Sequence, residues 1–224
     1  DSTGSVNTDA GFSIVSYSGN STAGATIAHG LGATPKMMIV RKRNSAENWL
    51  VYHASTGNTG ATLLNGTNAF FQDDMWNSTS PTSSVFTVHG GAGANASGGT
   101  YIAYCFTDVK GYSKFSSYIG NGNADGAFVY TGFKSAFVMI KKTSGTGNWC
   151  LFDNKRGVNG AMIQLNPDVN NADNTSNYID FLSNGFKCRN TASDKNASGG
   201  SYIYMAFAEQ PFVTGSSGIP ATAR

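Results

Sequence analysis

Apolar and polar residues alternate in short runs along this chain, which is the period of a β-strand. Residues 12–17 alternate between the two classes, and residues 50–53, 62–64 and 85–88 are strand-like runs bounded by glycine, asparagine and serine. No segment repeats its apolar residues with the period of a helix. The pattern therefore predicts an all-β fold.

Four other runs are apolar at almost every position: residues 37–40, 101–106, 137–140 and 202–207. A strand that is apolar on both of its alternating faces is typical of the middle of a sheet that is covered on both sides. We expect these four runs to be central strands of a sandwich.

The chain is internally duplicated in sequence. The eight residues from Asn95 to Ile102 return almost letter for letter from Asn196 to Ile203, and the pair Asn48-Trp49 returns as Asn148-Trp149. The period is roughly 100 residues, well above that of a solenoid repeat. Roughly six or seven short strands in each half fit an antiparallel β-sandwich with two similar halves.

The repeat sets the expected domain boundaries. Residues 1–10 are expected to be a polar N-terminal lead-in, 11–111 the first β repeat, 112–212 the second, and 213–224 a C-terminal tail. The linker at 107–111 is short, so we expect the second repeat to pack on the first.

Composition narrows the possible partners. Of the 224 residues, 40% are hydrophobic and only 12% are charged, and the formal net charge is +2. A nucleic-acid or anionic-membrane partner needs a concentrated field of Lys and Arg, so we expect no nucleic acid and no membrane insertion. The basic runs at 41–43 and 141–142 follow apolar strands and are interpreted as solvated strand ends.

The cysteines give no sign of redox or metal chemistry. Cys105, Cys150 and Cys188 lie far apart with no CxxC spacing, and their counterparts in the other half are Ala206, Leu50 and Val88. Because an apolar residue replaces each one, we expect free, buried thiols that pack as small hydrophobic side chains.

Motifs for catalysis are missing from the sequence. It contains no G-x-S-x-G, H-E-x-x-H or phosphate-binding glycine loop. His29, His53 and His89 lie at predicted strand ends and differ between the halves, which indicates loop surface. Acidic residues are few and form no evident pair for glycoside hydrolysis. We therefore predict that the protein is not an enzyme.

One Asn- and Asp-rich run, residues 166–174, places Asp168, Asn170 and Asp173 where their oxygens could bind Ca²⁺. The run lacks the EF-hand spacing and its bidentate Glu, and such runs are commonly turns. The prediction is no cofactor, with calcium at these three residues as the alternative.

Trp76 is the best candidate for a ligand contact. It lies in a polar loop and has no tryptophan counterpart in the second half, so packing common to both halves does not require it. An exposed ring beside amides and carboxylates suits saccharide recognition. The alternative is a ring folded over the edge of the sandwich. The residues expected to bind the ligand are Trp76, Asp73, Asp74, Asn77, Tyr52 and His53.

Three blocks carry a resemblance to a known group of proteins: residues 30–40, 49–53 and 95–106. They resemble a repeat found in bacteriophage tail-fibre and tail-associated virion proteins, especially those of marine phages. The likeness extends over about residues 11–212, and the ending 218–224 is also similar to the C-terminus of such proteins.

The resemblance implies a β-sandwich of the concanavalin-like kind, located on the virion surface and so extracellular, with no active site to transfer. It favours host attachment through loops that bind a host cell-surface glycan or receptor, in a homo-oligomer such as a trimer. The alternative is a purely structural tail or capsid decoration that contacts other virion proteins. Fold alone does not choose between them.

Overall fold

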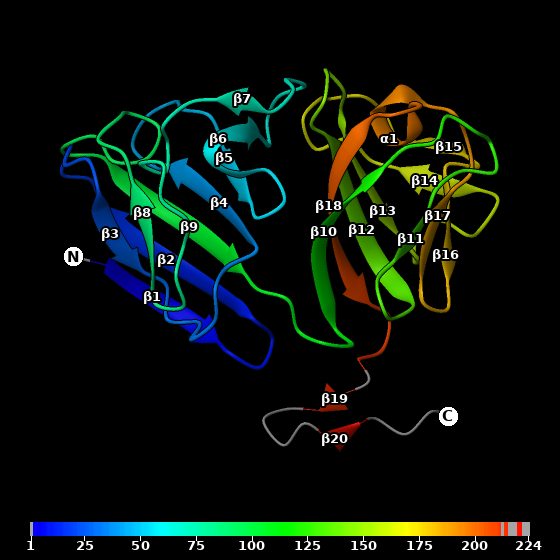
Figure 1. Cartoon of the computed structure of the whole chain (residues 1–224), viewed down its shortest axis with the longest axis horizontal. Coiled ribbons are helices and arrows are strands. Elements are labelled where there is room, and N and C mark those ends of the chain that lie inside the picture. The colour runs from blue at the N-terminus through cyan, green and yellow to red at the C-terminus, as the bar shows by residue number, and fades with distance from the viewer. Residues whose placement is uncertain (1, 212, 215–218, 221–224) are drawn as a thin grey trace. The chain divides into compact units, whose positions relative to one another are not determined.

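The computed structural model describes residues 2–211, 213–214 and 219–220 (Figure 1). The chain divides into two compact units. Unit 1 comprises Asp1–Asn65 and Phe70–Asp108, and unit 2 comprises Gly66–Ala69 and Val109–Arg224. Unit 1 ends slightly before the boundary expected at residue 111.

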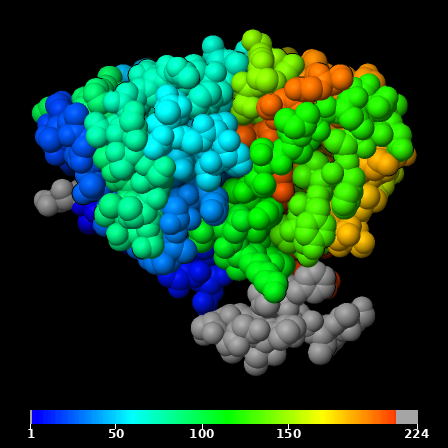
Figure 2. All heavy atoms as spheres, viewed as in Figure 1, coloured from blue at the N-terminus to red at the C-terminus, as the bar shows by residue number. Residues whose placement is uncertain are grey.

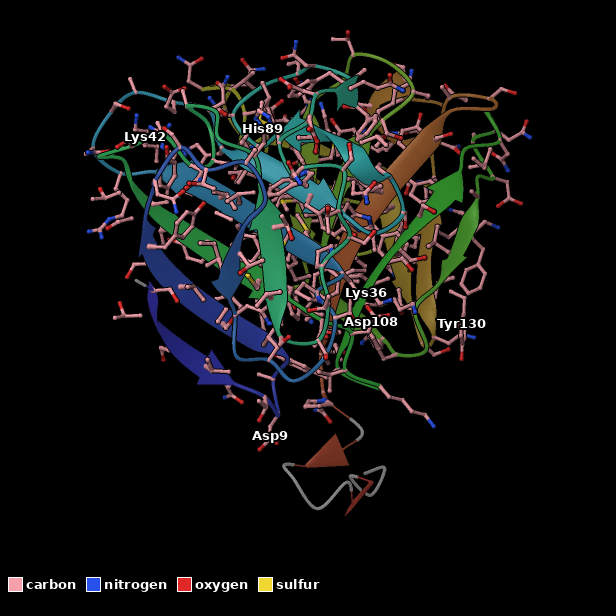
Figure 3. All side chains as sticks on the ribbon, turned by 60° about the vertical axis from the view of Figure 1, so that its left-hand side comes forward. Asp9, Lys36, Lys42, His89, Asp108 and Tyr130 are labelled. Carbon is pink, nitrogen blue, oxygen red and sulfur yellow. The ribbon has the colours of Figure 1, made fainter. Side chains whose placement is uncertain are left out.

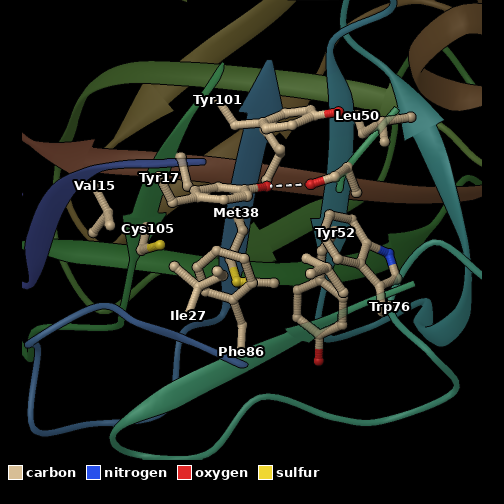
Figure 4. Packing of buried hydrophobic residues seen from close by; sticks show 14 of the residues in the cluster. Val15, Tyr17, Ile27, Met38, Leu50, Tyr52, Trp76, Phe86, Tyr101 and Cys105 are labelled. Atoms are coloured by element: carbon tan, nitrogen blue, oxygen red, sulfur yellow. Dashed lines mark hydrogen bonds between the residues drawn. The ribbon is translucent and has the colours of Figure 1, made fainter. Parts of the chain in front are cut away.

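Unit 1 contains a seven-stranded antiparallel sheet and a separate two-stranded ribbon. In spatial order the large sheet consists of β1 (Ser2–Asn7), β2 (Phe12–Ser18), β9 (Thr100–Phe106), β4 (Met37–Lys42), β5 (Leu50–His53), β6 (Gly57–Leu63) and β7 (Phe71–Gln72). The ribbon consists of β3 (Ala25–Ala28) and β8 (Val85–Val88). Tyr17 and Met38 of the sheet share one core cluster with Ile27 and Phe86 of the ribbon, so the core lies between two layers (Figure 4).

Unit 2 has a four-stranded and a three-stranded antiparallel sheet. The first, in spatial order, consists of β10 (Ser113–Ile119), β18 (Ser201–Ala208), β12 (Ser135–Lys142) and β13 (Trp149–Asp153). The second consists of β11 (Phe128–Tyr130), β17 (Gly185–Cys188) and β16 (Ile179–Leu182). The remaining elements are β14 (Met162–Gln164) with β15 (Asn174–Ser176), β19 (Val213–Thr214) with β20 (Ile219–Pro220), and the one-turn helix α1 (Ser193–Asn196).

The core of unit 2 lies between its two larger sheets. Ile140 and Tyr204 of the four-stranded sheet belong to one apolar cluster with Val129 and Phe186 of the three-stranded sheet. Side chains fill the spaces between the ribbons within each unit, as the space-filling view shows (Figure 2). The prediction of an all-β, antiparallel, sandwich-like fold is confirmed.

The predicted strands are present, and the fully apolar runs are central. β9 lies between β2 and β4, and β18 lies between β10 and β12. β6 begins at Gly57, earlier than the run at 62–64 suggested, because its first residues are polar and pair through their backbones. The described residues contain more strands than six or seven per half, since several short ones have no apolar pattern.

The N-terminal segment, expected to be a polar lead-in, contains a strand instead. Residues 2–7 form β1, which pairs with β2 along its whole length, from Ser2 opposite Tyr17 to Asn7 opposite Phe12. All six residues of β1 are exposed, so no alternation marks the strand in the sequence. Backbone hydrogen bonds alone are enough to add such a strand to a sheet edge. Of the expected tail at 213–224, only 213–214 and 219–220 lie within the described residues.

Two buried asparagines hold equivalent loops in the two units. Asn95 accepts a hydrogen bond at Oδ1 from the backbone N–H of Asn20 (3.0 Å), and Asn196 accepts the same bond from Asn121 (3.0 Å). Both side chains are at most 1% exposed. The amide nitrogen of Asn95 donates to Thr22 O (2.9 Å). These bonds give partners to the two asparagine side chains, which are themselves buried, and attach each loop to its unit.

Two pairs of tyrosines repeat the same geometry. Tyr17 stacks on Tyr101, and Tyr118 stacks on Tyr202, each with ring centroids 5.0 Å apart. Tyr17 donates to Ala94 O at 2.7 Å (Figure 4), as Tyr118 does to Lys195 O at 2.6 Å. The nearly identical sequence blocks therefore make the same contacts in each unit.

Candidate functional site

Trp76 does not offer an exposed ring. Its side chain is 0% exposed, its Nε1–H donates to Gly60 O at 2.9 Å, and it packs edge-to-face against Tyr52 (Figure 4). The prediction of a saccharide platform at Trp76 is therefore wrong. An indole is mostly apolar, and once its N–H has an acceptor its burial is favourable even from a polar loop.

The rest of the expected binding set is divided between interior and surface. Tyr52 and His53 are 4% and 1% exposed, whereas Asp73 and Asp74 are exposed and Asn77 is half-buried. Asp74 accepts a hydrogen bond from Ser78 within its own loop (3.1 Å). The structure does not bring these side chains to one accessible surface.

The histidines need a similar correction. His29 and His53 are buried rather than on the loop surface, and His89 is exposed. The His29 ring lies between Thr82 O (3.2 Å from Nε2) and the N–H of Leu31, which donates to Nδ1 (3.2 Å). Burial lowers the pKa of His29. A strand end can be covered by a neighbouring loop, which sequence position does not reveal.

The three residues considered for calcium have separate partners. Asp168 accepts a hydrogen bond at Oδ2 from the N–H of Trp149 (3.2 Å), and Asp173 pairs with Arg156 (3.2 Å), while Asn170 is exposed. Within the part of the chain that the structure describes, no group of three or more His, Cys, Asp or Glu side chains is placed to hold a metal ion.

The cysteines are free and buried, as predicted. Cys150 belongs to a group that we call the charged interior cluster, made of Cys150, Asp194 and Lys195. The Cys150 thiol donates to Asp194 Oδ2 (3.3 Å), and Lys195 Nζ lies 2.6 Å from Asp194 Oδ1. Lys195 is 1% exposed and its ammonium lies 4.6 Å from the ring centroid of Tyr178. A cation and a thiol here share one carboxylate inside unit 2.

Lys141 is another buried cation, and its interpretation as a solvated strand end is wrong. Its side chain is 0% exposed and its Nζ donates to the carbonyl oxygen of Gly147. Burial lowers the pKa of Lys141 to about 8, although the charge of Asp168 acts to raise it. The four-carbon stem of a lysine packs well in a core, so the sequence gives no warning of this burial.

The best candidate site is the outer surface of the three-stranded sheet β11–β17–β16. β11 is an edge strand whose central residue, Val129, points into the core. Its neighbours Phe128 and Tyr130 therefore point outward, and they are 48% and 65% exposed. The Tyr130 ring projects away from the ribbon (Figure 3). The two exposed rings lie on one strand, and we call the flat apolar surface that they form the aromatic strip. Large apolar side chains on an outer face suggest a binding surface.

A glycine on the neighbouring strand makes room for these rings. Gly185 lies opposite Tyr130, and a Cβ at Gly185 would collide with Val129 O and lie 3.1 Å from Cε2 of Phe128. Any larger residue at this position would displace the Phe128 ring. The absence of a side chain here therefore helps to shape the aromatic strip.

Charged side chains border the rings. Lys187, directly opposite Phe128 on β17, pairs with Asp125 at 2.6 Å, and Arg189 pairs with the same oxygen of Asp125 at 3.0 Å. Arg189 Nε also lies 3.1 Å from Asp180 Oδ2. The hydrogen bond from Lys187 holds the pKa of Asp125 below its usual range. We call this surface, made of Phe128, Tyr130, Asp125, Asp180, Lys187 and Arg189, the outer aromatic face.

Unit 1 has no such surface at the equivalent strands. Its ribbon has Thr26 and Ala28 as outward residues on β3, with Thr87 and Val85 opposite them on β8. The equivalent positions of unit 2 hold Phe128, Tyr130, Lys187 and Gly185. Among the described residues, the strands of unit 1 that correspond to β11 and β17 therefore carry no counterpart of the outer aromatic face.

Sequence reasoning missed this face because Phe128-Val129-Tyr130 is typical of a buried strand. Comparison of the two halves offers the one available signal: aromatic residues in the second copy replace a threonine and an alanine in the first. When large apolar residues replace small ones at outward positions in one half only, the change indicates a binding surface in that half and not core packing common to both halves.

Among the described residues, no helix is long and apolar enough to cross a lipid bilayer. A family model described as a domain of unknown function, DUF7483, matches residues 1–211. The chain belongs to this family. The DUF7483 match extends over both units, so the family is defined on the pair and not on a single unit. Neither a curated protein nor a solved structure matches the chain.

Proposed function

We propose that this DUF7483 chain is a non-enzymatic binding module that recognises a saccharide through the outer aromatic face. The observation that carries the proposal is the pair of outward rings, Phe128 and Tyr130, 48% and 65% exposed beside hydrogen-bonding charged groups. The C–H face of a sugar ring packs on an aromatic ring, and its hydroxyls need neighbouring donors and acceptors. The outer aromatic face offers both.

The resemblance to phage tail-fibre repeats supplies the setting of the proposal. The saccharide is then a host cell-surface glycan, and the module is displayed on the virion surface as part of a homo-oligomer such as a trimer. A single shallow surface binds weakly, but several copies on one particle raise the apparent affinity through avidity. The chemistry of the thiols agrees with a non-enzymatic role, because burial raises the pKa of Cys105 to about 12 and that of Cys188 to about 11.

The test is binding of the full chain to a glycan array and to candidate host cells, with the double variant Phe128→Ala/Tyr130→Ala beside the parent. Loss of both rings is expected to weaken binding by about tenfold or more, because stacked rings dominate such contacts. The matched control is Thr26→Ala, at the position of unit 1 equivalent to Phe128, which is expected to leave binding unchanged.

The far-ultraviolet circular dichroism of the variants must match that of the parent, since both rings lie on the surface. A folded parent that binds no saccharide and no host cell contradicts the proposal. That result would instead favour the purely structural alternative, in which the same face contacts another virion protein in a tail or capsid decoration.

A further inference from the structure

The cations of the outer aromatic face surround a position for a negative group. Lys187 Nζ and Arg189 Nη1 both lie against the same oxygen, Oδ1 of Asp125, at 2.6 and 3.0 Å. Both cations are anchored by the sheet: Lys187 lies on β17 and Arg189 directly follows that strand's last residue, Cys188. The geometry therefore defines a place where one anionic oxygen receives two charge-assisted contacts.

The group that fills this position belongs to a loop rather than to the sheet. Asp125 lies in the segment between β10 and β11 and its side chain is 78% exposed, against 26% and 33% for Lys187 and Arg189. The carboxylate thus covers the cations from the solvent side. A water-exposed ion pair contributes little to stability, so exchanging this carboxylate for another anion is energetically easy.

Asp180 has a different role. It is 18% exposed, lies 3.1 Å from Arg189 Nε, and accepts a hydrogen bond at Oδ1 from the N–H of Gly160 (3.2 Å). It therefore orients the Arg189 guanidinium from the side of the sheet. With Asp125 in place the two cations and two carboxylates cancel, and without Asp125 the group carries one net positive charge.

This anion position lies directly beside the aromatic strip. Phe128 is the cross-strand partner of Lys187, and such partners have Cβ atoms roughly 5 Å apart. Tyr130 follows two residues along the same strand, roughly 7 Å further. A sugar ring stacked on Phe128 could place a carboxylate or sulfate substituent at Lys187 and Arg189.

We infer that the ligand of the outer aromatic face is an acidic saccharide, one that carries carboxylate or sulfate groups, and that Asp125 occupies the anion position until the ligand displaces it. This inference rests on the proposed function and adds the ligand class and the role of Asp125. Unit 1 has Thr87 and His89 where unit 2 has the two cations, and Ala23 in place of Asp125, so it lacks the whole arrangement.

The test measures the dissociation constants of the full chain for three probes: oligogalacturonate, a sulfated galactan oligosaccharide and neutral maltooligosaccharide. Asp125→Asn removes the competing charge and is expected to tighten binding of an acidic probe by about fivefold at low salt. Lys187→Gln is expected to weaken it by about tenfold. Thr87→Ala, at the register position of Lys187 in unit 1, serves as the control and is expected to change nothing.

The two acidic probes separate carboxylate from sulfate recognition, and either one binding in this way supports the inference. Binding of the neutral probe as tightly as the acidic ones, lost in Phe128→Ala/Tyr130→Ala but unaffected by Asp125→Asn and Lys187→Gln, overturns the acidic class and leaves saccharide binding intact. A folded parent that binds none of the three probes overturns both the inference and the proposed function. Because Asp125 is on the surface, Asp125→Asn remains informative even if Lys187→Gln fails to fold.

Discussion

The two units share their hydrogen-bonded loops but differ in what fills the space beside them. In unit 1, Leu50 lies next to Gly93, where an added Cβ would be 2.9 Å from Leu50 Cδ1. The corresponding residues of unit 2 are Cys150 and Asp194, which hydrogen-bond to each other beside buried Lys195. One unit thus packs apolar atoms where the other holds ionised groups.

The outer surfaces of the two units also differ. Unit 1 presents Thr26 and Ala28 on β3, whereas unit 2 presents Phe128 and Tyr130 on β11. The shared contacts satisfy the buried side chains of Asn95 and Asn196, so both units need them. Positions that differ are free of this requirement, and they are where a specialised function can develop. Breaking each kind of contact tests this division.

The largest effect is expected from the shared asparagines. Asn196→Ala removes the partners of Asn121 N, Asn123 O and Asn190 O, and should lower the free energy of unfolding by about 3 kcal/mol. Asn95→Ala should lower it by a similar amount in unit 1, because the same kind of loop loses its bonds. Urea denaturation measures both.

The control for this pair is Asn170→Ala, an exposed asparagine whose loss should change stability by less than about 0.5 kcal/mol. If only one of the two substitutions lowered the free energy of unfolding, Asn95 and Asn196 would not support their units equally. The claim that the two units share these stabilising contacts would then be wrong.

A smaller effect is expected at the charged interior cluster, which is specific to unit 2. Lys195→Met leaves Asp194 without its cation in a mostly buried place and should lower the free energy of unfolding by about 2 kcal/mol. The double variant Asp194→Asn/Lys195→Met removes both charges and should recover most of that loss. Thermal or urea denaturation of the three proteins checks this.

The matched control is Lys134→Met, which breaks a surface ion pair with Glu209 of similar length, 2.7 Å, at a lysine that is 54% exposed. Its effect should stay below about 0.5 kcal/mol. A single Lys195→Met variant as stable as the parent would show that the buried ion pair does not stabilise unit 2.

The smallest effect concerns pH and Lys141. Folded Lys141 loses its proton near pH 8, whereas an unfolded lysine keeps it to about pH 10.4. The unfolded state therefore binds more protons in this window, so the parent should gain about 1.4 kcal/mol relative to Lys141→Met between pH 7 and pH 9. The difference between the two proteins in urea denaturation at several pH values measures this, and a constant difference from pH 7 to 10.5 would contradict it.

Much of the fold could be predicted from the sequence. A period-2 pattern located β2, and short runs bounded by glycine, asparagine and serine located β5 and β8. Fully apolar runs located the central strands β9 and β18. β1 could not be found in this way, because all its residues are exposed and no alternation of apolar and polar residues marks it. The candidate site was missed for a related reason: Phe128 and Tyr130 belong to an apolar run, and only the fold shows that they point away from the core.

Hydrophobic period and composition thus determined the all-β class, and the apolar counterparts of the three cysteines indicated the burial of the thiols. Only the tertiary structure decided which polar and aromatic side chains are accessible. Trp76 and Lys141 lie in polar or basic stretches of sequence and are buried, whereas Phe128 and Tyr130 lie in an apolar stretch and are exposed. Local sequence fixes the alternation of side chains along a strand, but which face meets the core depends on the partner sheet and covering loops, which come from distant parts of the chain.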